Sequence, residues 1–364
     1  GEPIAEAFYN RGLALKNLGR LEDAALSFRN ASVLKPQWTP AHTNYGFALL
    51  DLGFASAAVD VMRRCIEGGD TSTLSFSNLL LTAQYLPEFT IEEMNSLHRA
   101  YGRALQDACP ALPQRRLDPA AARLRVGFVS GDLRTHPVGL LLADVLPALS
   151  AHGLDVVALS TAPETMPRDP VRQRIREGVR EWHDVGHVDD AALAAFVRNA
   201  GIDVLVDLSG HTGHHRLAVF ARRPAPLQVT WLGYGATTGL DRIDYVLTDP
   251  VSTPPQDESQ FTERVWHLGL PRLPFSPPAE APEPSVEAPV DAAGVFTFGC
   301  FNNLAKLNPR VVGTWARILA AVPDSRLLLK SRHFDQPMAR KSVVEGFASF
   351  GVGAERVVLE GYDK

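Results

Sequence analysis

Cysteine is scarce in this chain of 364 residues, which has only Cys65, Cys109 and Cys300. Three thiols so far apart cannot form a disulfide framework or a four-thiolate zinc site, and this favours a reducing compartment. The sequence also lacks an apolar run of the roughly 20 residues that a membrane-spanning helix needs. Its first residues, GEPIAEAFYN, show no basic segment followed by an apolar one, as a signal peptide would. We therefore expect a soluble, cytoplasmic protein without membrane contacts.

Positive charge is not in excess either. Lys and Arg total 36 against 41 Asp and Glu, which gives a net charge of −5. This balance argues against a broad nucleic-acid-binding surface, so we expect no nucleic acid among the partners. The H-E-x-x-H, C-x-x-C, Walker A and G-x-S-x-G patterns are also missing, which argues against zinc protease, thiol redox, P-loop and α/β-hydrolase chemistry. The remaining composition, 45% hydrophobic and 21% charged, is typical of a globular protein.

The N-terminal part of the chain repeats itself with a period of 34 residues. The aligned pairs include Gly12 and Gly46, Leu15 and Leu49, Ala24 and Ala58, and Phe28 and Met62. Small residues at fixed places allow two antiparallel helices to pack closely and to stack on the next pair. The pattern resembles the tetratricopeptide repeat, and we assign residues 1–118 to such helical repeats. A third pair, around Leu74–Leu86 and Ile91–Cys109, loses the signature and is predicted to be a cap docked on the next domain.

Strands alternate with helices in residues 119–272, which predicts a doubly wound parallel sheet. The predicted strands are Leu124–Ser130, Leu154–Ser160, Glu181–Val185, Ile202–Ser209, Leu227–Gly233 and Asp244–Asp249. The predicted helices are Gly139–Ser150, Pro170–Gly178, Asp189–Ala200 and Arg216–Ala221. Because ligands bind beyond the carboxyl ends of strands in such sheets, the loops that follow the strands are the candidate site.

Three of these loops have unusual compositions. The loop GDLRTHPVG contains His136, the loop SGHTGHHR contains His211 and two further histidines, and the loop GYGATTG contains Gly235. Imidazoles titrate near neutral pH and serve as acids and bases, whereas glycines let backbone N–H groups approach a phosphate or a sugar. No acidic or thiolate ligand accompanies the histidines in their motif, so we do not expect a metal. Two histidine loops at adjacent strand ends favour a site.

A proline-rich linker, residues 273–293, separates this domain from a second α/β unit. Its segment LPFSPPAEAPEPSVEAPV has six prolines and is predicted to be extended and solvated. Residues 294–364 then alternate again. We predict strands at Val295–Asn302, Ser325–Ser331 and Arg356–Gly361, and helices at Pro309–Ala321 and Met338–Phe350. Three strands are half of a nucleotide-binding sheet.

These motifs together resemble one known family. The repeats, LRVGFVSGDLRTHPVG, RPAPLQVTWLGYGATTG and FGCFNNLAKLNP are similar to the O-linked N-acetylglucosamine transferases, glycosyltransferase family 41, in their bacterial form. The resemblance implies a GT-B fold of two Rossmann-like lobes, the second incomplete here, with the active site in the cleft between them. It also implies UDP-N-acetylglucosamine as donor, a Ser or Thr hydroxyl of a protein as acceptor, inversion at the anomeric carbon, and no metal or other cofactor.

The resemblance assigns roles to individual residues. His136 matches the family's histidine in the H-P loop, proposed as the catalytic base. His211 is a second base candidate, although animal members carry Tyr at this position. Lys306 matches a lysine that neutralises the UDP diphosphate, and Asn303 matches a donor-binding position that is Gln in animal members. In the GYGATTG loop we assign Gly235 and Thr237 to substrate binding.

Alternatives remain open at this stage. The family's downstream Gly-His-Thr-Thr donor motif is absent from these residues, so by themselves they are expected to turn over poorly or not at all. The transferred sugar could belong to another UDP-sugar, such as UDP-glucose. The repeats are either a truncated array that, with the cleft, binds peptide or protein acceptors, or a structural remnant. A non-catalytic peptide-binding scaffold is the alternative from another functional class.

Overall fold

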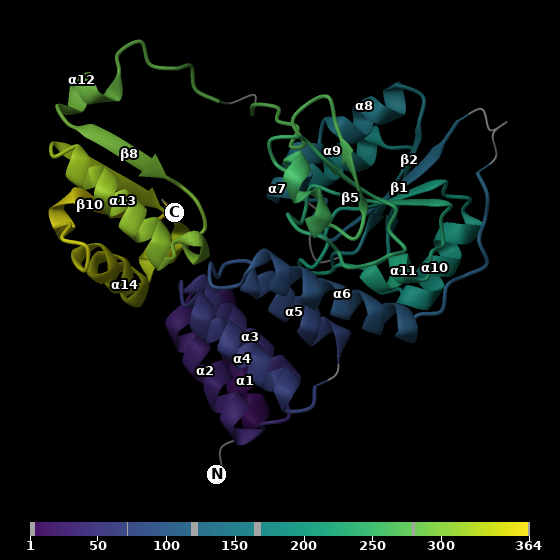
Figure 1. Cartoon of the computed structure of the whole chain (residues 1–364), viewed down its shortest axis with the longest axis horizontal. Helices are drawn as coiled ribbons and strands as arrows, with labels where there is room; N and C mark the ends of the chain where they lie inside the picture. Colours follow the sequence, from purple (N-terminus) through teal and green to yellow (C-terminus); the bar gives the residue numbers. More distant parts are fainter. Residues whose placement is uncertain (1–3, 71, 118–122, 164–168, 279–280, 363–364) are drawn as a thin grey trace. The chain divides into compact units, whose positions relative to one another are not determined.

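The computed structural model describes residues 4–70, 72–117, 123–163, 169–278 and 281–362 (Figure 1). Its contacts divide the chain into two compact units. The first combines the residues up to Phe89 with those from Pro282 onward, and the second is Thr90–Ala281. The predicted domain boundary between 118 and 119 lies outside the described residues.

The repeat helices of the first unit follow the 34-residue register. They are α1 (Ala5–Asn17), α2 (Leu21–Leu34), α3 (Thr39–Asp51), α4 (Ala55–Glu67) and α5 (Thr73–Ala83). A Cβ added to Gly12 would lie 2.6 Å from the ring of Phe28, and one added to Gly46 would lie 2.8 Å from Met62. The aligned small and large residues are therefore the contact points of each helix pair, as the sequence predicts.

Helix α6 (Ile91–Ala108) belongs to the second unit. It begins with a capping box, in which Thr90 and Glu93 each accept a hydrogen bond from the other's backbone N–H. A Cβ on Gly102 would collide with the carbonyl oxygen of Gly239, so the helix backbone lies directly against a loop of the sheet domain. The predicted docking of a cap on the next domain is confirmed for α6, whereas α5 stays with the repeats.

The second unit is built on one parallel sheet of seven strands in the order β3-β2-β1-β4-β5-β6-β7. The strands are β1 (Arg125–Ser130), β2 (Asp155–Ser160), β3 (Glu181–Asp184), β4 (Val204–Asp207), β5 (Leu227–Trp231), β6 (Tyr245–Thr248) and β7 (Arg264–His267). The six predicted strands are confirmed, and β7 is an additional one. Among the described residues, no helix is long and apolar enough to cross a membrane.

Besides α6, the described α-helices of this unit are α7 (Pro137–Leu142), α8 (Val145–Ala151), α9 (Pro170–Gly178), α10 (Asp190–Asn199) and α11 (Leu217–Ala221). The single helix predicted at Gly139–Ser150 is wrong, since it is divided into α7 and α8. Pro147 has no N–H with which to continue the ladder from α7, so the helix restarts with Pro147 in its first turn.

The rest of the first unit has a parallel sheet of three strands, in the order β10-β9-β8. The strands are β8 (Phe296–Cys300), β9 (Ser325–Lys330) and β10 (Val357–Glu360), and the longer helices are α13 (Pro309–Ala321) and α14 (Pro337–Ala348). Short 3-10 turns are η2 (Leu304–Lys306) and η3 (Arg332–Asp335). The linker is not wholly extended as predicted, because the short helix α12 (Pro289–Ala293) forms at its end with Pro289 in its first turn.

Candidate functional site

The three unusual loops follow three neighbouring strands of the seven-stranded sheet. Strand β1 pairs with β4, and β4 pairs with β5, all in parallel. The chain runs outward from β1 through β2 and β3 and then returns to β4 on the other side of β1. The loops with His136 and His211 thus flank the point where the strand order reverses. This is the place where doubly wound sheets bind ligands.

His136 lies at the N-terminus of α7, directly before Pro137. Its Nδ1 accepts a hydrogen bond from the N–H of Val138 at 3.3 Å, so the proton of the neutral ring is on Nε2. The side chain is 37% exposed. Partial burial lowers the pKa of His136, Arg134 lowers it further, and Asp132 opposes both. The imidazole is therefore neutral at neutral pH and reachable from solvent.

Asp132, from the same loop, stands behind His136. Its Oδ2 lies 3.7 Å from His136 Nδ1, and its Oδ1 accepts a hydrogen bond from Arg134 at 3.3 Å. The carboxylate itself is largely buried, with 9% of the side chain exposed. Sequence reasoning did not select Asp132, although an acidic residue four positions before a histidine is a usable signal.

His211 is buried, with 1% of its surface exposed. Its Nε2 lies 3.1 Å from the carbonyl oxygen of Thr238 and donates to it. The rings of His98, Tyr101 and Tyr234 surround it, with centroids 5.2, 4.6 and 5.1 Å away. Burial holds the pKa of His211 well below its usual value, and the neighbouring histidines lower it further. The ring is thus neutral and is enclosed by these three side chains.

Tyr234 of the GYGATTG loop is held by His98 of α6. His98 Nδ1 contacts the carbonyl oxygen of Met94 at 2.6 Å and must donate to it. Its Nε2 is then the acceptor for the Tyr234 hydroxyl at 2.9 Å. Burial lowers the pKa of His98 to about 4, which keeps this neutral form at neutral pH. Sequence reasoning missed His98, because it lies 136 residues away from its partner.

The other two predicted residues of this loop have different environments. Gly235 is exposed, and a Cβ there would meet nothing within 4 Å. Thr237 is buried, and its hydroxyl donates to Glu263 Oε2 at 2.6 Å while it accepts from the N–H groups of Gly239 and Thr262. Glu263 also accepts from the N–H and hydroxyl of Thr238. Burial raises the pKa of Glu263. Thr237 is therefore part of an internal anchor for the loop.

The carboxylate of Asp207 shapes the turn that carries His211. It accepts hydrogen bonds from the N–H groups of Ser209 and Gly210 and from the hydroxyl of Thr230. Burial raises the pKa of Asp207 to about 6 from 3.8. A raised folded-state pKa adds stability below about pH 4 that is lost as pH rises through about 6.

We therefore expect the contribution of Asp207 to the free energy of unfolding to fall as the pH rises from 4 to 6, by at most about 3 kcal/mol. Urea unfolding at several pH values measures this slope. The Asp207→Asn variant should show a shallower slope over this interval. An unchanged slope in the variant would contradict the assignment.

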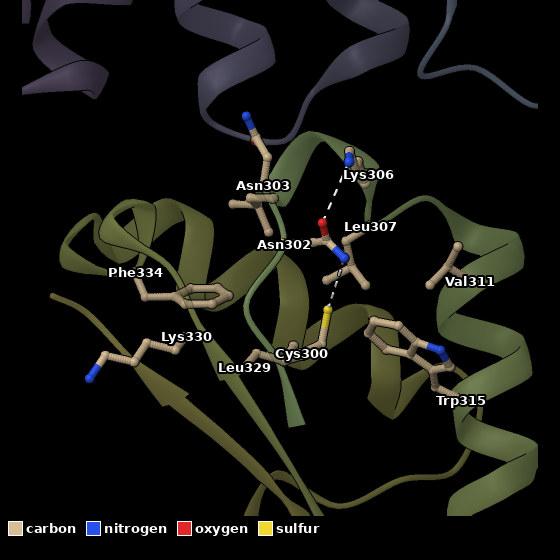
Figure 2. Close-up of a pocket in the computed structure, with 11 residues that line it drawn as sticks. Cys300, Asn302, Asn303, Lys306, Leu307, Val311, Trp315, Leu329, Lys330 and Phe334 are labelled. Carbon is tan, nitrogen blue, oxygen red and sulfur yellow. Dashed lines mark hydrogen bonds between the residues drawn. The ribbon is translucent and has the colours of Figure 1, made fainter. Parts of the chain in front are cut away.

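The predicted donor-side residues lie in the first unit, at a pocket of about 170 Å³ beyond the carboxyl ends of β8 and β9 (Figure 2). We call it the donor pocket. Its lining combines polar side chains from the β8–α13 connection with the apolar side chains of α13, β9 and η3. The residues are Cys300, Asn302, Asn303, Leu304, Lys306, Leu307, Val311, Trp315, Leu329, Lys330 and Phe334. The structure thus brings Asn303 and Lys306 together at one cavity.

Lys306 is exposed at the rim of the donor pocket, where its Nζ lies 3.4 Å from Asn302 Oδ1 (Figure 2). The Asn303 side chain caps η2 by accepting from the N–H of Ala305 at 3.0 Å. Helix α13 follows, with Asn308 as its N-cap, as the sequence predicts. A cation so close to a helix N-terminus is unfavourable unless an anion binds between them. Among the described residues, no three His, Cys, Asp or Glu side chains gather as a metal site.

The sequence profile described as Glycosyl transferase family 41 matches residues 104–271. A tomato (Solanum lycopersicum) protein named probable UDP-N-acetylglucosamine–peptide N-acetylglucosaminyltransferase SPINDLY is 35% identical over 287 residues, 78% of this chain and 30% of that protein. A Caenorhabditis elegans UDP-N-acetylglucosamine–peptide N-acetylglucosaminyltransferase is 32% identical over 149 residues, 40% of this chain and 13% of its own length.

A solved structure is similar over nearly the whole chain. It is a mutant of the Thermobaculum terrenum O-GlcNAc transferase, 34% identical with a TM-score of 0.91, and the match covers 99% of this chain and 68% of that one. The chain therefore spans about a third of the tomato relative and about two thirds of the bacterial structure.

Proposed function

Because this chain belongs to glycosyltransferase family 41, we propose that its protein transfers N-acetylglucosamine from UDP-N-acetylglucosamine to Ser or Thr hydroxyls of proteins. The observation that carries the proposal is the donor pocket, which joins an exposed ammonium group, two amide side chains and an aromatic wall. Its relatives are named for this reaction. Three unpaired cysteines fit a cytoplasmic location.

The reaction is an in-line displacement at the anomeric carbon of the sugar. The acceptor oxygen forms the new bond as the bond from carbon to the diphosphate oxygen breaks, UDP leaves, and the hydroxyl proton passes to a base. Catalysis therefore requires a base near the acceptor and positive charge near the leaving diphosphate. This chain offers an imidazole for the first requirement and an ammonium for the second.

We assign the leaving diphosphate to Lys306. A diphosphate between Lys306 and the N-terminus of α13 would meet both an ammonium and the positive end of a helix. Asn303 lines the same pocket as Lys306 and supplies an amide group for the nucleotide. We propose that the transfer needs no metal ion, because Lys306 and the N-terminus of α13 neutralise the negative charge of the diphosphate in place of a metal cation.

We assign the base to His136, with Asp132 as its orienting carboxylate. In the neutral ring the proton is on Nε2, so Nε2 can take the acceptor proton only after the ring has exchanged its tautomer. Asp132 Oδ2, 3.7 Å from Nδ1, is placed to face the Nδ1–H of that second form and to orient the ring, without taking its proton. The carboxylate then stabilises the imidazolium that the reaction produces.

The remaining candidates have supporting roles in this proposal. Gly235 of the GYGATTG loop is exposed, so its backbone can approach a substrate. His211 and Thr237 are both buried, and we propose that they support the loops after β4 and β5 from the interior of the domain. We propose that protein acceptors reach the site along the repeats and the cleft between the lobes.

Replacing Lys306 tests the donor side directly. We expect Lys306→Ala to weaken UDP binding by about 10- to 100-fold, because it removes a charge-assisted contact with the diphosphate. Isothermal titration of UDP into this chain, in EDTA to exclude metal ions, measures the change. The control is Lys341→Ala, which removes the same charge from the exposed face of α14.

Equal binding by the wild type and Lys306→Ala would place the diphosphate elsewhere. A wild-type chain that binds no UDP while binding peptides would favour the scaffold alternative. Competition by UDP-glucose and UDP-N-acetylglucosamine in the same titration decides between the two sugars.

A further inference from the structure

The turn η2 separates two cavities of the first unit. On one side is the donor pocket. On the other is a cavity of about 250 Å³ lined by Leu52 and Gly53 of the repeats together with residues of α13 and α14. Leu304 and Leu307 line both cavities. The wall between the repeats and the donor pocket is therefore a single turn of chain.

The residues of this turn differ in exposure according to their polarity. Leu304 and Ala305 are buried, with 5% and 3% of their surfaces exposed. Ala305 packs within a hydrophobic cluster of the repeats that includes Leu50, Ala55 and Ala58. Asn303 and Lys306, the polar members, are exposed and line the donor pocket. Apolar contacts with the repeats thus fix the turn that presents both polar groups.

Gly53 of the repeats lies next to Leu304 of the turn. It lies in the connection between α3 and α4 with a positive φ of 89°, and a Cβ added there would lie 3.2 Å from Leu304 Cγ. Two further contacts hold the repeats to the segment that begins α14. The N–H of Met338 donates to Glu22 at 2.7 Å, and Gln336 Nε2 donates to the carbonyl oxygen of Gly19 at 2.8 Å. The repeats therefore contact this part of the unit at η2 and again at the start of α14.

We propose that the α3–α4 connection of the repeats, at Leu52 and Gly53, is a positioning element of the nucleotide site. It sets the place of Asn303 and Lys306 through Leu304 and Ala305, and it thereby couples the state of the repeats to the affinity for a nucleoside diphosphate. This inference rests on the proposed function, in which the donor pocket takes UDP.

The repeat itself supplies a matched pair of variants. Gly53 and Gly19 occupy the same position 34 residues apart, and both have positive φ, 89° and 73°. An alanine at either site meets the same kind of backbone strain. A Cβ at Gly19 meets nothing within 4 Å, whereas a Cβ at Gly53 presses on Leu304. Gly19 contacts Gln336 through its backbone carbonyl oxygen, which an alanine retains. The comparison therefore cancels the general loss of stability and leaves the push on Leu304 as the difference between the two variants.

UDP titration into the full chain is the test. We expect Gly53→Ala to weaken UDP binding by about 3- to 10-fold and Gly19→Ala to change it by less than twofold, with similar melting temperatures for the two variants. Equal weakening by both variants, or no weakening by Gly53→Ala, would overturn the proposal.

Amide hydrogen exchange in residues 301–308 provides a readout that needs no nucleotide. We expect exchange there to be at least threefold faster in Gly53→Ala than in Gly19→Ala. If the wild-type chain binds no UDP, the proposed function fails, and this exchange measurement alone decides whether the repeats position the turn. Equal exchange rates would refute the positioning role.

Discussion

Replacement of His136 by alanine is expected to lower the turnover rate of sugar transfer by about 10²- to 10⁴-fold, the usual contribution of a positioned general base. UDP affinity should stay within about threefold, because the assigned partners of the diphosphate are Lys306 and α13. Transfer assays with the intact protein, combined with UDP titration, separate the two effects. The variant His152→Ala removes an exposed imidazole from the same domain and is the control.

The pH profile provides a second signature of the same residue. Because burial lowers the pKa of His136, the wild-type rate should hold steady below pH 6.5 before it falls in more acidic solution. His136→Ala should lose this acidic limb, and Asp132→Asn should reduce the rate about tenfold. A His136→Ala protein with more than half of the wild-type rate would mean that another group removes the proton.

Replacement of Glu263 by alanine is expected to lower the free energy of unfolding by about 3–5 kcal/mol. The change leaves two threonine hydroxyls and the N–H of Thr238 without their buried acceptor, and each such loss costs about 1–3 kcal/mol. A domain of this size then melts about 6–20 °C lower. Calorimetry of the purified chain measures the shift.

Glu258→Ala is the control for this experiment. Glu258 is on the surface, with 42% of its side chain exposed, and it pairs with His267 at 2.8 Å. Its loss should cost no more than about 1 kcal/mol. If Glu263→Ala and Glu258→Ala melted at the same temperature, the hydrogen bonds of Glu263 to the GYGATTG loop would not contribute this stability.

Local pattern was sufficient to locate most elements of this protein. The 34-residue period places the repeat helices, and alternating apolar runs place the strands β1 to β6 and β8 to β10. The helix α13 begins where Asn308 and Pro309 predict, because an N-cap and a first-turn proline act within one turn. The rule for doubly wound sheets also brings the loops of His136 and His211 to one edge.

The partners of the candidate residues depend on contacts across long stretches of sequence. His98 reaches Tyr234, Glu263 holds Thr237, and Gly53 supports Leu304. Only tertiary packing decides that His211 is buried while His136 stays half-exposed, since both residues follow strands in similar loops. The sequence alone thus determined which segments fold and which edge carries the chemistry. The tertiary structure decided which side chains reach solvent, because burial depends on what the rest of the chain packs against.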